Sequence, residues 1–115
     1  MRVVKAADVP RVRAAVAHSL RPFIHEDLDT ITLLVTELLS NALRHGGSPA
    51  ICSVDWKSCR VRVEVCDANP TAPEVLESAP DSIGGRGMKL VDALSSSWGW
   101  HPNDDGKCVW FEIAA

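Results

Sequence analysis

The stretch that decides the fold is TELLSNALRHGG, residues 36–47, a leucine-rich run that closes on two glycines. Its apolar residues recur at helical spacing, which predicts the end of an amphipathic helix, and Gly46-Gly47 stands where a left-handed C-cap is expected. Glu37 and Asn41 are four residues apart, so their side chains project from the same side of that helix. The helix therefore presents a carboxylate and a carboxamide together to whatever packs against it.

Two helices are expected in the first part of the chain. The apolar spacing extends the helix of residues 36–47 back to about Glu26-Asp27, whose carboxylates suit a helix N-terminus. A shorter helix precedes it, with Asp8 as the expected N-cap and a stop at Arg21-Pro22. Residues 1–7 are expected to add a short edge strand.

Downstream, the apolar spacing changes to a period of two, which predicts strands. Residues 51–56 and 60–66 should form an antiparallel hairpin around Lys57-Ser58. A third helix from Met88 and a final hairpin follow, over residues 88–94, 98–101 and 107–113. This order predicts one α+β domain over residues 1–115, a two-layer sandwich whose mostly antiparallel sheet carries its helices on one face.

The connection between Asp67 and Gly87 is rich in Pro, Ala, Ser, Gly and acidic residues and is longer than usual, which indicates a lid or a binding loop. It ends in GGRGMKLV, residues 84–91, a glycine turn that runs directly into an apolar helix. Free N–H groups and the helix dipole favour an anion such as phosphate there, although such a turn is also a common helix cap. The Lys-Ser/Thr pair of a P-loop is missing.

Composition narrows the class of protein. The chain has 115 residues, a net charge of −3 and 46% hydrophobic residues, as expected for one globular domain. It lacks the basic stripe that would neutralise phosphates, so we expect no direct nucleic-acid partner. No apolar run is long enough to span a membrane, and no signal peptide follows Met1-Arg2, so we expect a cytoplasmic protein.

The four cysteines, Cys52, Cys59, Cys66 and Cys108, form no CxxC pair and have no clustered histidines, so zinc-ligand spacing is absent. We expect buried, reduced thiols that pack as small apolar side chains. A metal or disulfide role is the alternative.

Three polar groups could carry chemistry. Asn41 could hold a hydrated magnesium ion while Glu37 orients or deprotonates a hydroxyl or water; the alternative is a solvated polar side of the helix. Asp67 stands at a strand end, where a carboxylate commonly makes a turn but can also accept a hydrogen bond from the exocyclic amine of a purine.

Taken in order, Glu37 with Asn41, Asp67, and Gly85-Arg86-Gly87 resemble the N, G1 and G2 boxes of the GHKL superfamily, the histidine-kinase-like ATPases. The segments TELLSNALRHG, DANP, GRGMKLVDAL and GKCVWFEI are similar to its small single-domain branch, which includes the anti-sigma-factor serine/threonine kinases and related ATP-binding regulatory proteins. This resemblance covers nearly the whole chain and implies the Bergerat-type ATP-binding fold.

The resemblance also implies roles for individual residues. Glu37 would be the catalytic base or polarising carboxylate, Asn41 the magnesium ligand, and Asp67 the acceptor for the adenine amine. The remaining nucleotide-binding positions that it implies are Asn69, Gly85, Arg86, Gly87, Met88 and Cys108. The implied cofactors are ATP and Mg²⁺.

The function that the resemblance implies is a serine/threonine protein kinase. It would phosphorylate a small regulatory protein of the anti-anti-sigma type and thereby control a sigma factor, with a homodimer as a further open possibility. Two departures support an alternative. The G1 pattern DxGxG reads DANPT here, and Cys108 stands where many relatives have Thr. The alternative is a GHKL-shaped binding module that holds nucleotide weakly, or not at all, and acts by sequestering a protein partner.

Overall fold

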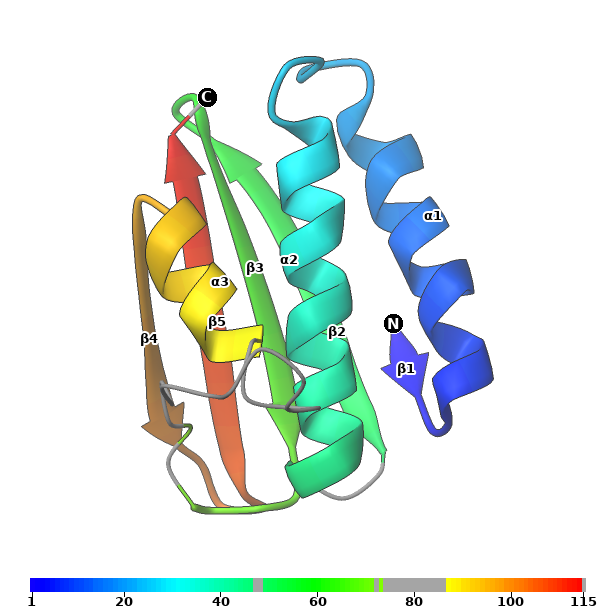
Figure 1. The fold of residues 1–115 in the computed structure, drawn as a ribbon, viewed down its shortest axis with the longest axis vertical. Coiled ribbons are helices and arrows are strands. Elements are labelled where there is room, and N and C mark those ends of the chain that lie inside the picture. The colour runs from blue at the N-terminus through cyan, green and yellow to red at the C-terminus, as the bar shows by residue number, and fades with distance from the viewer. Residues whose placement is uncertain (47–48, 72, 74–86, 115) are drawn as a thin grey trace.

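The computed structural model describes residues 1–46, 49–71, 73 and 87–114. These residues form a five-stranded antiparallel sheet in the order β1-β2-β3-β5-β4, with the three α-helices on one face (Figure 1). The elements are β1 Arg2–Val3, α1 Val9–Leu20, α2 Leu28–Asn41, β2 Ala50–Lys57, β3 Arg60–Asp67, α3 Gly87–Leu94, β4 Ser97–Pro102 and β5 Lys107–Ala114. The two-layer α+β sandwich that the sequence predicts is therefore confirmed.

The helix α1 begins after a short 3-10 turn, Ala6–Asp8, and ends before Pro22 as expected. Asp8 occupies the N-cap position, but its carboxylate accepts hydrogen bonds from the backbone N–H groups of Val4 and Lys5, at 3.0 and 3.2 Å, instead of from the helix. These backbone bonds are the main reason why the pKa of Asp8 is lowered. Asp8 thus fixes the turn between β1 and α1.

The central helix α2 packs against both α1 and α3. Its apolar side chains are buried in the core, and the buried set is Ile31, Leu34, Val35, Leu38 and Leu39. The α-helical hydrogen bonding stops at Asn41, and a turn of π-helix continues over Ala42–Gly46. The helical segment thus reaches Gly46 as predicted, while Gly47 lies outside the described residues.

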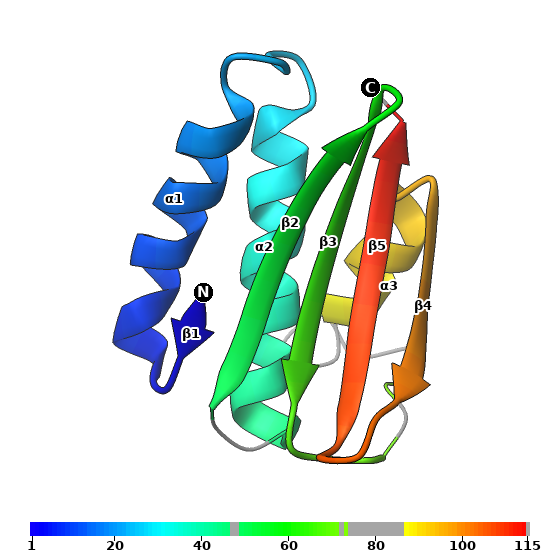
Figure 2. The ribbon, with the colours of Figure 1, turned by 180° about the vertical axis from the view of Figure 1, so that it is seen from behind.

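The sheet separates two environments. Residues that alternate along β3 and β5 bury their side chains beneath the helices: Val61, Val63, Val65, Val109, Phe111 and Ile113. Seen from behind, no described helix covers the opposite face (Figure 2). The β2–β3 hairpin turns at Ser58 and Cys59, whose φ angles are 54° and 60°, while Lys57 still pairs with Arg60. The expected turn at Lys57-Ser58 was wrong by one residue. No helix in the described part of the chain is long and apolar enough to cross a membrane.

The prediction of four buried, reduced cysteines holds only for Cys52. Cys66 and Cys108 form a disulfide, and Cys59 is an exposed free thiol in the hairpin turn. The disulfide arises because the antiparallel register of β3 and β5 places Cys66 directly opposite Cys108. Burial raises the pKa of the Cys52 thiol to about 11, so that thiol stays protonated in the folded protein.

Candidate functional site

Three chain segments that carry predicted site residues lie in the same half of the molecule. The C-terminal half of α2, the first turn of α3 and the C-terminal end of β3 all lie towards the lower end of Figure 1. The two helices pack against each other, and β3 runs beneath them. Residues from the N-box, G1-box and G2-box regions thus share one half of the fold.

Glu37 and Asn41 are both partly exposed on α2. Within the described residues, neither side chain hydrogen-bonds to another protein group, although buried leucines flank them on the same helix. Asn41 is also the last α-helical residue before the π-turn, a feature that is frequent at functional sites. A carboxylate and an amide oxygen without internal partners are suited to bind a hydrated cation or to orient a hydroxyl.

Asp67 is buried at the end of β3, where only 6% of its surface is exposed. Its Oδ1 accepts a hydrogen bond from the Asn69 backbone N–H at 2.9 Å and a charge-assisted bond from Lys107 Nζ at 3.0 Å. No donor among the described residues reaches its second oxygen, Oδ2. Asp67 therefore makes a local turn, as one sequence interpretation has it, and within the described residues its Oδ2 is left to an external donor.

Lys107 is the site residue that the sequence interpretation missed. Its side chain is buried, and its Nζ bridges Asp67 Oδ1 and the backbone carbonyl of Asn69, at 3.0 Å each. The inward alternation of Ile113, Phe111 and Val109 reaches Lys107 if it is followed two residues further back. The sequence signal for this residue is thus a lysine at a position where the strand pattern predicts a side chain that faces the core.

Gly106 allows β5 to approach the G1 region closely. A Cβ atom on Gly106 would lie 2.1 Å from the carbonyl oxygen of Asp67 and 2.6 Å from the carbonyl carbon of Ala68. Real Cβ atoms do not approach backbone so closely, so only glycine fits here without moving the chain. The Gly106-Lys107 pair thus sets the position of Asp67 from two sides.

Asn69, in the altered G1 turn, fastens this turn to the end of the long helix. Its side-chain amide donates to the backbone carbonyl of His45, and its Oδ1 accepts from the Thr71 N–H at 2.9 Å. The missing glycines of the G1 pattern are therefore replaced here by a hydrogen-bonded Asx turn. The hydrogen bond from Asn69 to His45 joins the G1 region to the π-helical turn that follows Asn41.

The glycine turn is described only in part. Gly85 and Arg86 lie outside the described residues, as does most of the expected lid. Gly87 begins α3, and Met88 is buried with 2% of its surface exposed, as part of the core. The first turn of α3 therefore supplies a helix N-terminus beside α2, whereas the Met88 side chain packs into the core.

Cys108 lies away from this site. It follows the inward-facing Lys107, so its side chain points to the opposite face of the sheet, where it bonds to Cys66. The alternation of the strand thus places Lys107 beside Asp67 and Cys108 on the other face, and a part of Cys108 in nucleotide binding stays a prediction from the resemblance.

The fold is similar to those of known proteins. The chain resembles the histidine kinase domain of the blue-light activated histidine kinase EL346 from Erythrobacter litoralis, with a TM-score of 0.55 and 22% identity. That match covers 95% of this chain and 60% of the other, so the chain spans less than two thirds of that domain. A second match, the nucleotide-free catalytic domain of the histidine kinase ThkA, has a TM-score of 0.58 and 17% identity and covers 99% and 94% of the two chains.

At these identities the two structures support the fold alone. Among curated proteins, a sequence comparison finds no match. The model of the histidine kinase-like ATPase domain matches residues 3–113. Because that match spans almost the whole sequence, the chain belongs to the family of histidine kinase-like ATPase domains, and this membership implies that it binds ATP.

Proposed function

We propose that this domain is a serine/threonine protein kinase that uses Mg·ATP to phosphorylate a small regulatory protein of the anti-anti-sigma type and thereby controls a sigma factor. The observation that best supports this proposal is the Glu37–Asn41 pair. Its two polar side chains have no partner among the described residues, and they lie on the half of α2 that faces the start of α3 and the end of β3.

The donor set fits the ligands that the family implies. Asn41 offers an amide oxygen, which is a suitable ligand for Mg²⁺. Asp67 offers a buried carboxylate whose Oδ2 has no protein donor among the described groups, and this atom would accept the adenine amine. The start of α3 provides the backbone N–H groups of a helix N-terminus, which favour phosphate.

When bound, Mg·ATP supplies the phosphoryl group, and this chain supplies its positioning. Glu37 would orient the serine or threonine hydroxyl of the partner protein and take its proton. Lys107 and Asn69 would keep the Asp67 carboxylate in one orientation, so that little rearrangement is needed when nucleotide binds. Arg86 stays a proposed phosphate contact from its place in the sequence alone.

The alternative function, a binding module that sequesters a protein partner without catalysis, has one structural observation in its favour. Oδ1 of Asp67 is already occupied by Lys107, and the altered G1 turn is tied to the carbonyl of His45. Both contacts reduce the freedom of the adenine side of the site. Neither contact involves Glu37 or Asn41. The kinase and the sequestering module therefore differ in whether phosphate is transferred more than in the fold that they require.

The deciding experiment compares Glu37→Gln with the wild type. We expect both proteins to gain thermal stability from Mg·ATP, by about 2.7 kcal/mol at a hundred times the dissociation constant. Only the wild type should transfer the labelled γ-phosphate to small regulatory proteins from the same genome. Loss of one positioned base should slow transfer by about 10²–10⁴-fold.

The matched control is Asp55→Asn, which removes an exposed carboxylate from β2 on the uncovered face of the sheet and should change neither measurement. Transfer that persists in Glu37→Gln would refute the catalytic role of Glu37. A stabilising effect of Mg·ATP without transfer by the wild type to any candidate would favour the sequestering module.

A further inference from the structure

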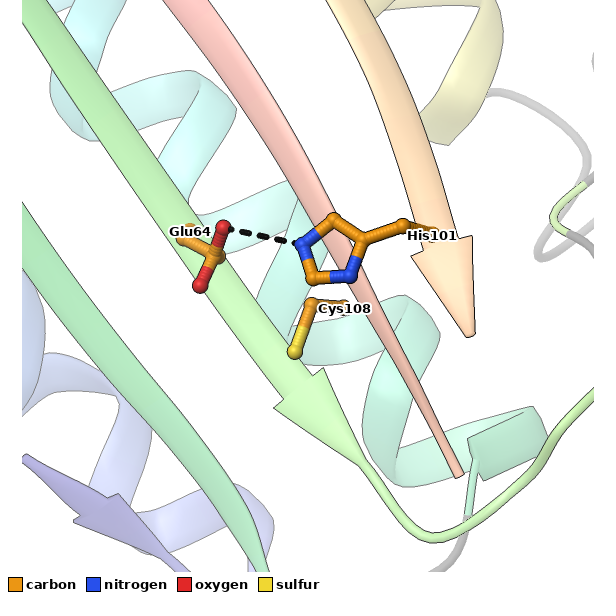
Figure 3. Close-up of side chains that lie close together, drawn as sticks. All are labelled: Glu64, His101 and Cys108. Atoms are coloured by element: carbon orange, nitrogen blue, oxygen red, sulfur yellow. Dashed lines mark hydrogen bonds and ion pairs between the residues drawn. The ribbon is translucent and has the colours of Figure 1, made fainter. Parts of the chain in front are cut away.

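The uncovered face of the sheet gathers a second group of reactive side chains, separate from the proposed nucleotide site. One ligand atom each from Glu64, His101 and Cys108 lies within 4.8 Å of the others (Figure 3). These residues come from the three adjacent strands β3, β4 and β5. The register explains the cluster, because Cys108 pairs with Cys66 on one side and with His101 on the other.

Cys66 adds a fourth candidate ligand to the cluster. Its sulfur is bonded to Cys108 Sγ and lies 3.7 Å from Glu64 Oε1, two residues earlier on the same side of β3. The cluster therefore contains two sulfurs, an imidazole and a carboxylate. This is the ligand set that Zn²⁺ prefers, with tetrahedral coordination by N, S and O atoms.

We infer that Cys66, Cys108, His101 and Glu64 form a redox-controlled Zn²⁺ site, which is closed by the disulfide and opened by its reduction. In the disulfide form both sulfurs are committed to each other. A dithiol reductant breaks the S–S bond by exchange: both protein sulfurs become thiols, and the reductant becomes a disulfide. Binding of Zn²⁺ then forms two S–Zn bonds and releases the two thiol protons.

The imidazole of His101 is oriented for this role. Its Nε2 faces Glu64 Oε2 at 3.4 Å, and its Nδ1 lies 3.4 Å from the backbone carbonyl of Pro102. In the tautomer that carries its proton on Nδ1, directed at this carbonyl, Nε2 is the ligand atom and lies on the side of Glu64, an arrangement that is usual for metal-binding histidines. Half of the His101 side chain is exposed, so an ion can reach it from solvent.

The remaining contacts are compatible with a bound ion. Asn103 Nδ2 donates to Cys108 Sγ at 3.2 Å, and such a donor also stabilises a thiolate. Glu64 Oε2 has a second, 3.5 Å contact with the half-exposed Arg62 guanidinium, which leaves Oε1 available. Two thiolates on one tetrahedral ion lie roughly 3.8 Å apart, given bonds of about 2.3 Å. Reduction of the disulfide therefore lets the two sulfurs move apart to the distance that a shared ion needs.

This inference does not depend on the proposed kinase function, because it concerns the opposite face of the sheet and is tested without nucleotide. The full chain is reduced with a phosphine, which becomes a phosphine oxide with oxygen from water, and is then titrated with Co²⁺ as the spectroscopic probe. We expect one equivalent to give the visible absorption of tetrahedral cobalt and a thiolate charge-transfer band. Zn²⁺ should displace the cobalt.

Variants separate a built site from incidental binding. His101→Ala changes an exposed residue, so the protein should stay folded, and we expect at least tenfold weaker binding. Cys108→Ser should lose most of the thiolate band. The matched control Cys59→Ser removes the exposed thiol in the β2–β3 turn and should bind as the wild type does.

The disulfide form should show no thiolate band at the same cobalt concentration. Absence of the band in the reduced, folded wild type would overturn the inference. An equally strong band in Cys108→Ser, or its loss in Cys59→Ser, would also overturn it.

Discussion

The two faces of the sheet differ in how their paired strands accommodate charged side chains. On the inner face, Asp67 and Lys107 pair across β3 and β5 with only 3–4% of their side chains exposed. On the outer face, the adjacent residues Cys66 and Cys108 face each other, and Glu112, further along β5, bonds to two arginines. A shift of a single residue in register would exchange the two sets, because alternate side chains point to opposite faces.

The difference between the faces is one of solvent access. The inner pair has lost its water and depends on its geometry, because each charge needs the other. The outer ion pairs stay in contact with water, which screens them. Breaking the inner pair should therefore lower the free energy of unfolding more than breaking an outer ion pair. The outer groups should respond more to pH, salt and redox state.

The largest expected effect comes from breaking the inner pair. Lys107→Ala leaves the buried Asp67 carboxylate without its cation and should lower the free energy of unfolding by about 3–5 kcal/mol. Urea denaturation with linear extrapolation measures this loss.

The control for this prediction removes both charges. The double variant Asp67→Leu/Lys107→Met should be more stable than Lys107→Ala, because neither charge remains buried alone. A loss below about 1 kcal/mol in the single variant would mean that the pair behaves like a surface salt bridge. A double variant no more stable than the single would contradict the same prediction.

A second comparison uses one glycine near each face. A Cβ at Gly106 meets the backbone of Asp67 and Ala68, whereas a Cβ at Gly99 meets the Trp110 indole, with its nearest atom at 2.8 Å. Backbone cannot move without disturbing the strand pairing, but an indole can tilt. Gly106→Ala should therefore cost about 1–3 kcal/mol, as overpacking does, and Gly99→Ala should cost less.

The identical substitution at the two glycines makes each variant the control for the other. Thermal unfolding of both proteins under the same conditions gives the comparison. Gly99→Ala should also weaken the stacking of Arg62 on Trp110, whose guanidinium carbon lies 4.2 Å from the ring centroid. An equal or larger loss from Gly99→Ala would show that the approach of Gly106 to Asp67 is not a constraint.

The sequence predicted the elements well because their signals are local. Helical spacing, alternating strands, Pro22 and the glycines before Met88 are each visible within a few residues, and they account for the element order that the structure confirms. The inward Lys107 was also within reach, as the next step of an alternation already recognised in β5. It was missed because a lysine was not expected under the helices.

Long-range contacts had no comparable signal. The Cys66–Cys108 disulfide joins residues 42 apart and depends on β5 pairing next to β3, which no spacing of cysteines encodes. The Asn69 contact is also hidden, because its acceptor is the backbone carbonyl of His45, a group that every residue has. The outer-face cluster has no local sequence signal either, because its ligands come from three strands that are brought together only by the sheet pairing.

The smallest effect is expected at Glu112 on the outer face. Its oxygens accept from Arg60 and Arg62 at 3.1 Å each, and the Arg60 bond is the main reason why the pKa of Glu112 is lowered. A carboxyl with a lowered pKa in the folded state stabilises the protein above its unfolded pKa of about 4.3, and this contribution is lost as the pH falls through the folded pKa. Glu112→Gln should therefore be less stable than the wild type at pH 7, by less than about 1 kcal/mol.

This stability gap should close with acid and with salt, which distinguishes it from the inner pair. Denaturation at pH 7 and at a series of pH values below about 4.3 measures the first effect, because the gap should narrow step by step as the pH falls through the lowered pKa of the folded protein. Repeating the pH 7 comparison in 1 M salt measures the second, because the ion pairs of Glu112 are partly exposed and are screened. A gap that persists unchanged at low pH would assign the loss to packing of the Glu112 side chain, and the electrostatic contrast between the two faces would then rest on Asp67 and Lys107 alone.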